Sequence, residues 1–193
     1  MKKISFFAIL LLSASSAFSE YTPSWESPIQ QRPSLTAAGA ERVISDFRET
    51  LRKENAVGCI VVRSSSGAVL ASFNDYDSLP SAASQFEAAP FLASPVADPR
   101  AALAAMKAAS ANFFGVNSED IPEKEFLAHN TAFPRARLTN LAGGVNLRSA
   151  SGGFLGSIGV TAFTVKGRKD LSGKIASQVA LAAAPYLNPS PKP

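Results

Sequence analysis

The sequence predicts an α+β domain with a mostly antiparallel sheet, formed by two β-hairpins with helices packed against it. Three segments carry apolar residues at intervals of three and four, which is the pattern of amphipathic helices. Two pairs of short runs rich in strand-forming residues lie between these segments, and a connection rich in Ser and Gly separates the members of each pair. Because a hairpin joins neighbouring antiparallel strands, we expect the element order helix, hairpin, helix, hairpin, helix.

The first helix is predicted over residues 36–54. Charged side chains occupy one face, and the opposite, apolar face consists of Ala40, Val43, Ile44, Phe47 and Leu51. Ser34 or Thr36 can cap the start of this helix, and Asn55 and Gly58 lie where a helix would end. We therefore expect its apolar face to be buried in the core.

The first hairpin is predicted to consist of strands at 57–63 and 68–73. The first of these strands is apolar at almost every position, so both of its faces should be covered and it should lie inside the sheet. Its Cys59 is the only cysteine in the chain, which excludes an intramolecular disulfide and leaves an intermolecular bridge as the alternative to a free thiol. Because no basic neighbour would stabilise a thiolate, Cys59 is expected to be an inert, buried thiol.

The middle of the chain is predicted to contain a long irregular connection followed by a helix. Residues 74–99 contain four prolines among Ala and Ser, which indicates an irregular excursion with at most one helical turn, at 82–87. Asp98 is positioned to cap a helix at 99–114, which starts with a proline and is followed by Gly115. The spacing within this helix predicts a buried face formed by Leu103, Met106, Ser110 and Phe113.

The second hairpin and a last helix complete the expected fold. A polar connection at 117–125 and an irregular segment at 126–133 precede two predicted strands, at 138–148 and 154–163. The last helix is predicted at 170–187, because apolar residues recur there at helical spacing. Its buried stripe is expected to include Ile175, Val179 and Ala182, with Tyr186 as a further candidate.

The two ends of the chain differ in composition from the predicted domain at 35–187. Residues 1–19 are predicted to be a secretory signal peptide, because two lysines precede a short apolar run and the segment ends in Ala-Phe-Ser, a small-x-small cleavage pattern. Residues 20–34 contain three prolines and form an expected N-terminal arm, and 188–193 form a proline-rich C-terminal tail. The protein is therefore expected to be periplasmic or secreted.

The charge and hydropathy of the chain limit the kinds of partner that it can have. The formal net charge of +4 falls to about +2 when the two lysines of the leader are removed, and no run of Lys or Arg remains. We therefore expect no nucleic-acid partner. No segment after the leader is long and apolar enough to anchor the chain in a membrane, and the remainder is long enough for one soluble domain with a sizeable core.

Few residues point to catalytic chemistry. His129 is the only histidine, so a two-histidine metal site within one chain is excluded, and a Ser-His-Asp arrangement would depend on this residue alone. The nucleophile-elbow, P-loop and dinucleotide motifs are absent. Gly143-Gly144 and Gly152-Gly153 lack the strand-to-helix context of a phosphate site, so we expect a close backbone approach at the first pair and a hairpin turn at the second.

His129 and Lys107 each allow two interpretations. His129 lies between Phe126 and Phe133, where an imidazole can hydrogen-bond the backbone or ligate haem iron. Lys107 lies inside an Ala-rich helix, and the residues alone favour a surface lysine whose aliphatic stem covers apolar neighbours. A functional lysine in a binding pocket is the alternative.

Several linked segments resemble the GlcG/HbpS family of haem-binding proteins, whose domain also forms the C-terminal part of the PduO corrinoid enzymes. Ala105–Ala109 with Phe113–Gly115 resembles the family's lysine-alanine helix ending in Phe-Gly. The most specific likeness is Leu141–Leu147 leading to Leu155–Thr161, which is similar to the family's Pro-Gly-Gly-Val-Pro hairpin and Gly-Ala-Ile-Gly-Val-Ser strand. The resemblance covers about residues 34–184, most of the chain without its leader.

The resemblance implies a sheet-and-helix domain that forms homo-oligomers and binds haem, with a sensing or haem-degrading role in some members. Lys107, Gly143 and Gly144 match the family's motifs, and the resemblance assigns these positions to the cofactor site. The chain departs from the family pattern at Asn146, where the family has proline, and in the long connection at 74–99. The role of His129 as iron ligand is inferred from its own neighbours.

The leading hypothesis is an exported haem-binding protein that acts in haem scavenging or sensing, with haem or a related tetrapyrrole as its partner. In this hypothesis Lys107 lines the pocket and contacts a propionate, Gly143 and Gly144 lie beside it, and His129 is the metal ligand. Two alternatives are a haem-degrading or corrinoid-linked enzyme and a non-enzymatic oligomeric scaffold that binds a protein partner. Scavenging or sensing ranks first because an exported chain lacks the nucleotide pools that corrinoid metabolism uses.

Overall fold

The structure is a computed structural model, and the residues that it describes all belong to one compact unit of the chain, Arg32–Pro193. The described ranges are 33–75, 99–133, 138–165 and 169–187. Several predictions lie outside them: the signal peptide, all but the last two residues of the arm, the connection after Asp75 with its helical turn, the cap at Asp98 and the C-terminal tail.

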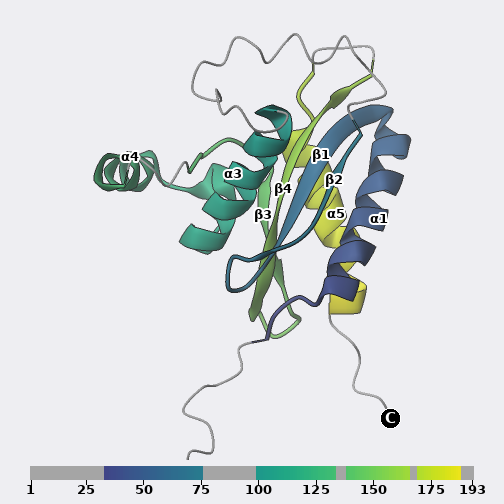
Figure 1. The fold of residues 1–193 in the computed structure, drawn as a ribbon, viewed down its shortest axis with the longest axis horizontal. Coiled ribbons are helices and arrows are strands. Elements are labelled where there is room, and N and C mark those ends of the chain that lie inside the picture. The colour runs from purple at the N-terminus through teal and green to yellow at the C-terminus, as the bar shows by residue number, and fades with distance from the viewer. Residues whose placement is uncertain (1–32, 76–98, 134–137, 166–168, 188–193) are drawn as a thin grey trace, which may run out of the picture. The chain divides into compact units, whose positions relative to one another are not determined.

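The described residues form a four-stranded antiparallel sheet with helices on both faces (Figure 1). The strands lie in the order β2, β1, β4, β3, and their bounds are β1 Ala56–Ser64, β2 Val69–Asn74, β3 Gly144–Arg148 and β4 Phe154–Thr164. The helices are α1 Ala37–Glu54, α3 Pro99–Phe114, the 3₁₀ helix η3 Ser118–Asp120, α4 Glu123–Ala132 and α5 Ser172–Leu187. The predicted α+β class with a mostly antiparallel sheet is confirmed.

The helices α1 and α5 cover one face of the sheet, and α3 covers the other (Figure 1). The strands β1 and β4 pair along the whole of β1, from Ala56 opposite Thr164 to Ser64 opposite Gly156. Almost every residue of β1 is buried, which confirms the prediction that it lies inside the sheet. Cys59 is buried on the α3 face, where its Sγ donates a hydrogen bond to Asn74 Oδ1 at 3.2 Å.

The ends of α1 are determined by the residues that the sequence singles out. Thr36 is the N-cap, and its Oγ1 accepts a hydrogen bond from the main-chain N–H of Gly39 at 3.1 Å. Asn55 ends the helix in the left-handed conformation, with φ 48°, and its main-chain N–H donates to the carbonyls of Leu51 and Arg52. The chain therefore turns directly from α1 into β1.

The predicted buried face of α3 is partly wrong. Leu103 and Ser110 are buried, but 61% of Phe113 is exposed. The residues that face the sheet are instead mostly small, and they include Ala104, Lys107, Ala108 and Ala111. Small side chains bring the helix close to β4, where Gly159 leaves room for the main chain of Ala104 and Ala108. The positions of the large apolar residues therefore do not predict which face of this helix is buried.

Two further expectations are wrong in the second half of the chain. The segment at 126–133, expected to be irregular, belongs mostly to α4. None of the residues of α4 is buried, so the helix has no apolar stripe for a periodicity argument to detect. The strand predicted at 138–148 begins only at Gly144, because Gly143 has φ +112° and the main chain before it bonds to side chains instead of a neighbouring strand.

The helix α5 follows its prediction closely. Ile175 and Val179 are buried as expected, but Ala183 takes the place that was expected for Ala182. The helix packs on the same core as Phe47 of α1. In the part of the chain that the structure describes, we find no helix with the length and hydropathy needed to cross a membrane.

Candidate functional site

Lys107 lies on the face of α3 that contacts the sheet, and only 2% of it is exposed. Its Nζ donates a hydrogen bond to the main-chain carbonyl of Val160 on β4 at 3.0 Å. Burial lowers the pKa of the Lys107 ammonium to about 8, and the carboxylates of Asp170 and Glu119 oppose this shift to a smaller extent. Lys107 is therefore not the surface lysine that its sequence pattern favours.

The two glycines predicted beside Lys107 do lie there. Gly143 has φ +112°, its carbonyl accepts a hydrogen bond from the N–H of Val160 at 2.8 Å, and a Cβ built on it would be 3.3 Å from Lys107 Nζ. A Cβ on Gly144 would collide with the carbonyl oxygen of Lys107. The expected close backbone approach is confirmed, and the structure brings Lys107, Gly143 and Gly144 together.

Two buried serines that the sequence analysis missed complete this arrangement. Ser118 Oγ donates to the carbonyl of Leu141 at 2.5 Å and accepts from the N–H of Gly144 at 2.9 Å. Ser172 Oγ accepts from the N–H of Ala162 at 3.1 Å. Both serines lie in polar segments without a motif, so no sequence signal identifies them.

We refer to Lys107, Gly143, Gly144, Ser118 and Ser172 as the lysine cluster. Its side chains are almost completely enclosed, and each one satisfies a main-chain group near the start of β3 or along β4. Buried polar groups that are paired in this way stabilise one arrangement of the backbone. The geometry of the lysine cluster is therefore that of a support for the sheet, and we assign Lys107 no contact with a propionate.

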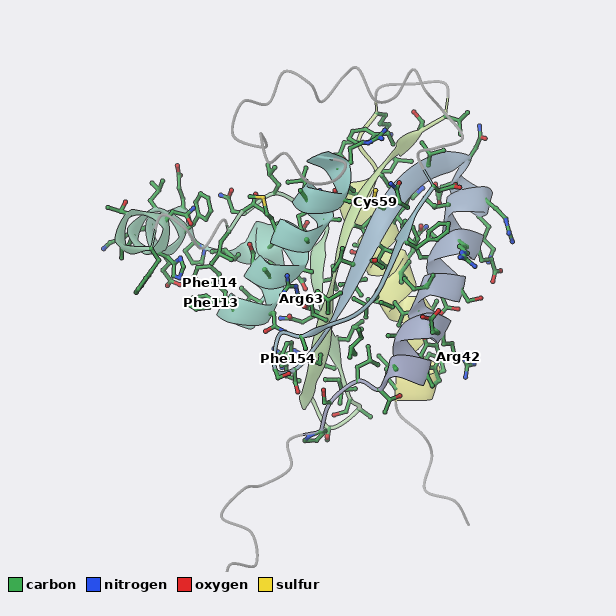
Figure 2. All side chains as sticks on the ribbon, viewed as in Figure 1. Arg42, Cys59, Arg63, Phe113, Phe114 and Phe154 are labelled. Carbon is green, nitrogen blue, oxygen red and sulfur yellow. The ribbon has the colours of Figure 1, made fainter. Side chains whose placement is uncertain are left out.

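His129 lies on α4, and aromatic rings surround it. Its imidazole centroid is 4.5 Å from the ring of Phe113, 5.7 Å from that of Phe114 and 5.1 Å from that of Phe133. Figure 2 shows Phe113 and Phe114 in the corner between α3 and α4. We refer to these four residues as the aromatic cluster.

The imidazole of His129 has an unused nitrogen. Its Nδ1 is buried and has no hydrogen-bond partner among the described residues. A buried polar atom without a partner costs about 1–3 kcal/mol, so such atoms usually find a partner in water, a ligand or an ion. The described part of the chain contains no group of three or more His, Cys, Asp and Glu side chains that could hold a metal ion without further ligands.

The residues of the aromatic cluster fit a haem group. Imidazole is a common axial ligand of haem iron, and aromatic side chains suit the faces of a porphyrin. Phe113 and Phe133 expose 61% and 60% of their surface, so apolar area is available for a planar ligand. None of the contacts within the described residues joins His129 to the lysine cluster, so the predicted site residues form two separate groups.

The comparisons with known proteins place the chain in a structural class. No protein-family model matches the sequence, and no curated protein matches it. The fold is similar to protein ORFY from Klebsiella pneumoniae, with a TM-score of 0.59, 17% sequence identity, and coverage of 81% of this chain and 94% of that one. This chain and ORFY therefore share an α+β fold.

Two more solved structures have this fold. An HbpS double mutant from Streptomyces reticuli matches with a TM-score of 0.56 and 17% identity over 80% of this chain and 90% of that one. The PduOC–haem complex matches with a TM-score of 0.54 and 15% identity over 78% of this chain and 94% of that one. The resemblance to the HbpS and PduO proteins inferred from the sequence is thus confirmed for the fold.

Proposed function

We propose that this chain binds haem and that His129 on α4 is the protein ligand to the iron. The observation that carries the proposal is the aromatic cluster, where one imidazole with an unpaired buried Nδ1 lies against three phenylalanine rings. The fold also supports haem binding. HbpS and PduOC share this fold, and PduOC was solved as a complex with haem.

The residues of the aromatic cluster would each contribute to haem binding in a different way. When bound, the group supplies an iron centre that accepts an axial nitrogen ligand and exchanges electrons. His129 would donate that nitrogen, while Phe113 and Phe133 would cover porphyrin surface and exclude water from it. The Lys107 ammonium already bonds to Val160, so its task is to hold α3 against β4.

Export and self-association are part of the proposed function. A leader at 1–19 would take the domain out of the cytoplasm, where scavenging or sensing of haem is a more suitable role than cofactor synthesis. Before haem is bound, the large exposed areas of Phe113 and Phe133 favour association of copies of this chain, since exposed apolar patches often mark interfaces.

A titration with haemin tests the binding claim. Haemin is added to the purified chain without its leader, and the Soret band is compared with that of free haemin in the same buffer. We expect a shifted band that saturates at a defined stoichiometry. A Lys107→Met variant is the matched control, because it alters the lysine cluster and leaves the aromatic cluster intact. A spectrum identical to that of free haemin would refute haem binding, and loss of binding by a Lys107→Met protein that keeps the wild-type circular dichroism would refute a purely structural role of this lysine.

A further inference from the structure

A cleft of about 540 Å³ lies beside the last turn of α1, where β1 begins and β2 ends. It shares no residue with the lysine cluster or the aromatic cluster. Its volume falls within the range of small-molecule sites, about 300–1,000 Å³. The residues that line it are Arg48, Leu51, Arg52, Asn55, Ala56, Val57, Phe73, Asp75 and Val165.

The cleft has an apolar, firmly held side. Leu51, Ala56 and Val57 are buried parts of the core, so their positions are determined by packing on both faces of β1. The main-chain carbonyl of Asn55 accepts a hydrogen bond from the N–H of Val165 at 3.0 Å, which joins the α1–β1 turn to the end of β4. This side therefore offers a preformed surface to the hydrocarbon part of a ligand.

The opposite side of the cleft carries positive charge. Arg48 and Arg52 are one helical turn apart on α1, and neither forms an ion pair with a described carboxylate. The guanidinium carbon of Arg48 lies 4.2 Å from the ring centroid of Phe73, a cation–π contact that restricts its orientation. Among the described residues of the lining, Asp75 is the one acidic side chain, so the arginines give this part of the cleft an excess of positive charge.

The cleft lies at the C-terminal end of α1, and the carbonyl end of a helix is partly negative. This position reduces the excess of positive charge in the cleft. The main-chain N–H of Asn55 bonds to two of these carbonyls, those of Leu51 and Arg52. The two guanidinium charges exceed the sum of the Asp75 carboxylate and the remaining charge of the helix end, which is about half a unit. An anion is therefore still favoured over a cation at this cleft.

We propose that this cleft binds a small organic acid, with its carboxylate on Arg52 and Arg48 and its apolar body against Leu51 and Val57. Guanidinium groups match carboxylates in shape and charge, and the buried residues match a hydrocarbon body. An inorganic anion would leave the apolar side uncovered. The described residues of the lining include no His, Cys or Met side chain to bind iron, so the ligand differs from the proposed haem.

A pair of isosteric probes tests the charge requirement on the wild-type protein without haemin. Phenylacetate and its neutral amide, phenylacetamide, are titrated separately, and the main-chain amide signals of the protein are followed by two-dimensional NMR. We expect saturable shifts for Arg52, Asn55, Val57 and Val165 with phenylacetate, and weaker binding of phenylacetamide by roughly tenfold, the effect of a charge-assisted hydrogen bond. Equal binding of the two probes, or no saturable shift at these residues, would overturn the proposal.

Two adjacent substitutions test the assignment to the cleft. Arg52→Gln removes a charge that lines the cleft, whereas Lys53→Gln removes the same charge from the neighbouring position, which lies outside it. We expect phenylacetate binding to weaken by roughly tenfold in Arg52→Gln and to be unchanged in Lys53→Gln. Equal weakening in both variants would show only a general charge effect. Since haemin is absent from these measurements, their outcome is independent of haem binding.

Discussion

Lys107 on α3 and Val160 on β4 are joined by a buried hydrogen bond of 3.0 Å from the lysine Nζ to the main-chain carbonyl. The N–H of the same Val160 donates to the carbonyl of Gly143, so both main-chain polar groups of Val160 are used. An ammonium group inside an otherwise Ala-rich interface is costly to desolvate, and this cost lowers its pKa. Because only the charged form of Lys107 has this desolvation cost, the free energy of unfolding depends on pH.

The free energy of unfolding is predicted to rise with pH above about 8 because of Lys107. Its pKa is lowered to about 8 in the folded state from 10.5, so between these values the unfolded chain binds more protons than the folded chain. The cost of the buried charge is therefore fully present below pH 8 and is relieved as the pH rises to 10.5, with a total effect of about 3 kcal/mol.

Urea unfolding of the wild type and of Lys107→Met at a series of pH values measures this effect. The variant has no ammonium to titrate at this position, so other ionising groups contribute equally to both proteins. We expect the difference in unfolding free energy to change in favour of the wild type between pH 8 and 10.5. Parallel curves over this range would contradict the lowered pKa.

Substitution of Gly143 by alanine is predicted to be much more destabilising than substitution of Gly152. Both glycines have positive φ, +112° and +81°, so each substitution introduces backbone strain. At Gly143 the added Cβ also collides with the carbonyl oxygen of Val160, whereas at Gly152 it meets nothing within 4 Å. We expect losses of about 3 kcal/mol or more for Gly143→Ala and about 1 kcal/mol for Gly152→Ala.

Thermal or urea unfolding of the two variants provides this comparison, with Gly152→Ala serving as the control for strain alone. Equal losses would mean that the close approach of Gly143 to Val160 does not contribute to stability. The same experiment examines the lysine cluster without changing any of its polar side chains.

Self-association of the haem-free chain is predicted to depend on the exposed ring of Phe113. Replacement of this side chain by serine, Phe113→Ser, should shift the sedimentation profile toward smaller species, because 61% of the ring is exposed on the proposed interface. Leu181→Ser is a suitable control, since this leucine is 74% exposed but lies on α5. A wild-type protein that sediments as a monomer, or an equal effect of both substitutions, would rule out this interface.

If the chain is exported, its leader should be removed at one defined position. When the full chain is produced in a bacterium with a secretion apparatus, mass spectrometry should find the exported product beginning at Glu20. Ala17→Asp places a charge at a position where signal peptidase accepts small residues, so this variant should retain its leader. An unprocessed wild-type chain in the cytoplasm would contradict export.

The sequence predicts those parts of the fold whose residues have a single plausible environment. A cap at Ser34 or Thr36, a helix end near Asn55 and the all-apolar strand β1 follow from local preferences, and the structure has the cap at Thr36, the end at Asn55 and the buried strand. Lys107 is different, because a buried lysine and a surface lysine have the same neighbours along an Ala-rich helix. The resemblance to the family, and not the local pattern, indicated its place beside Gly143 and Gly144.

The residues that the sequence analysis missed depend on contacts between distant segments. The helix α4 has no buried stripe, so its existence could not be inferred from apolar spacing. Ser118 bonds to residues more than twenty positions away, and Phe113 is exposed because small residues take its expected place against the sheet. His129 was selected for its aromatic neighbours, but two of its three ring contacts, Phe113 and Phe114, come from α3.

Spectroscopy of the haem-loaded His129 variants tests the central claim most directly. His129→Phe retains an aromatic ring among the phenylalanines and removes the nitrogen, whereas His129→Ala leaves a space that added imidazole can occupy. We predict that both substitutions change the axial-ligand signature in the Soret region and in resonance Raman spectra, and that imidazole restores the wild-type signature in His129→Ala but not in His129→Phe. Spectra of both variants identical to that of the wild type would show that His129 is not the iron ligand.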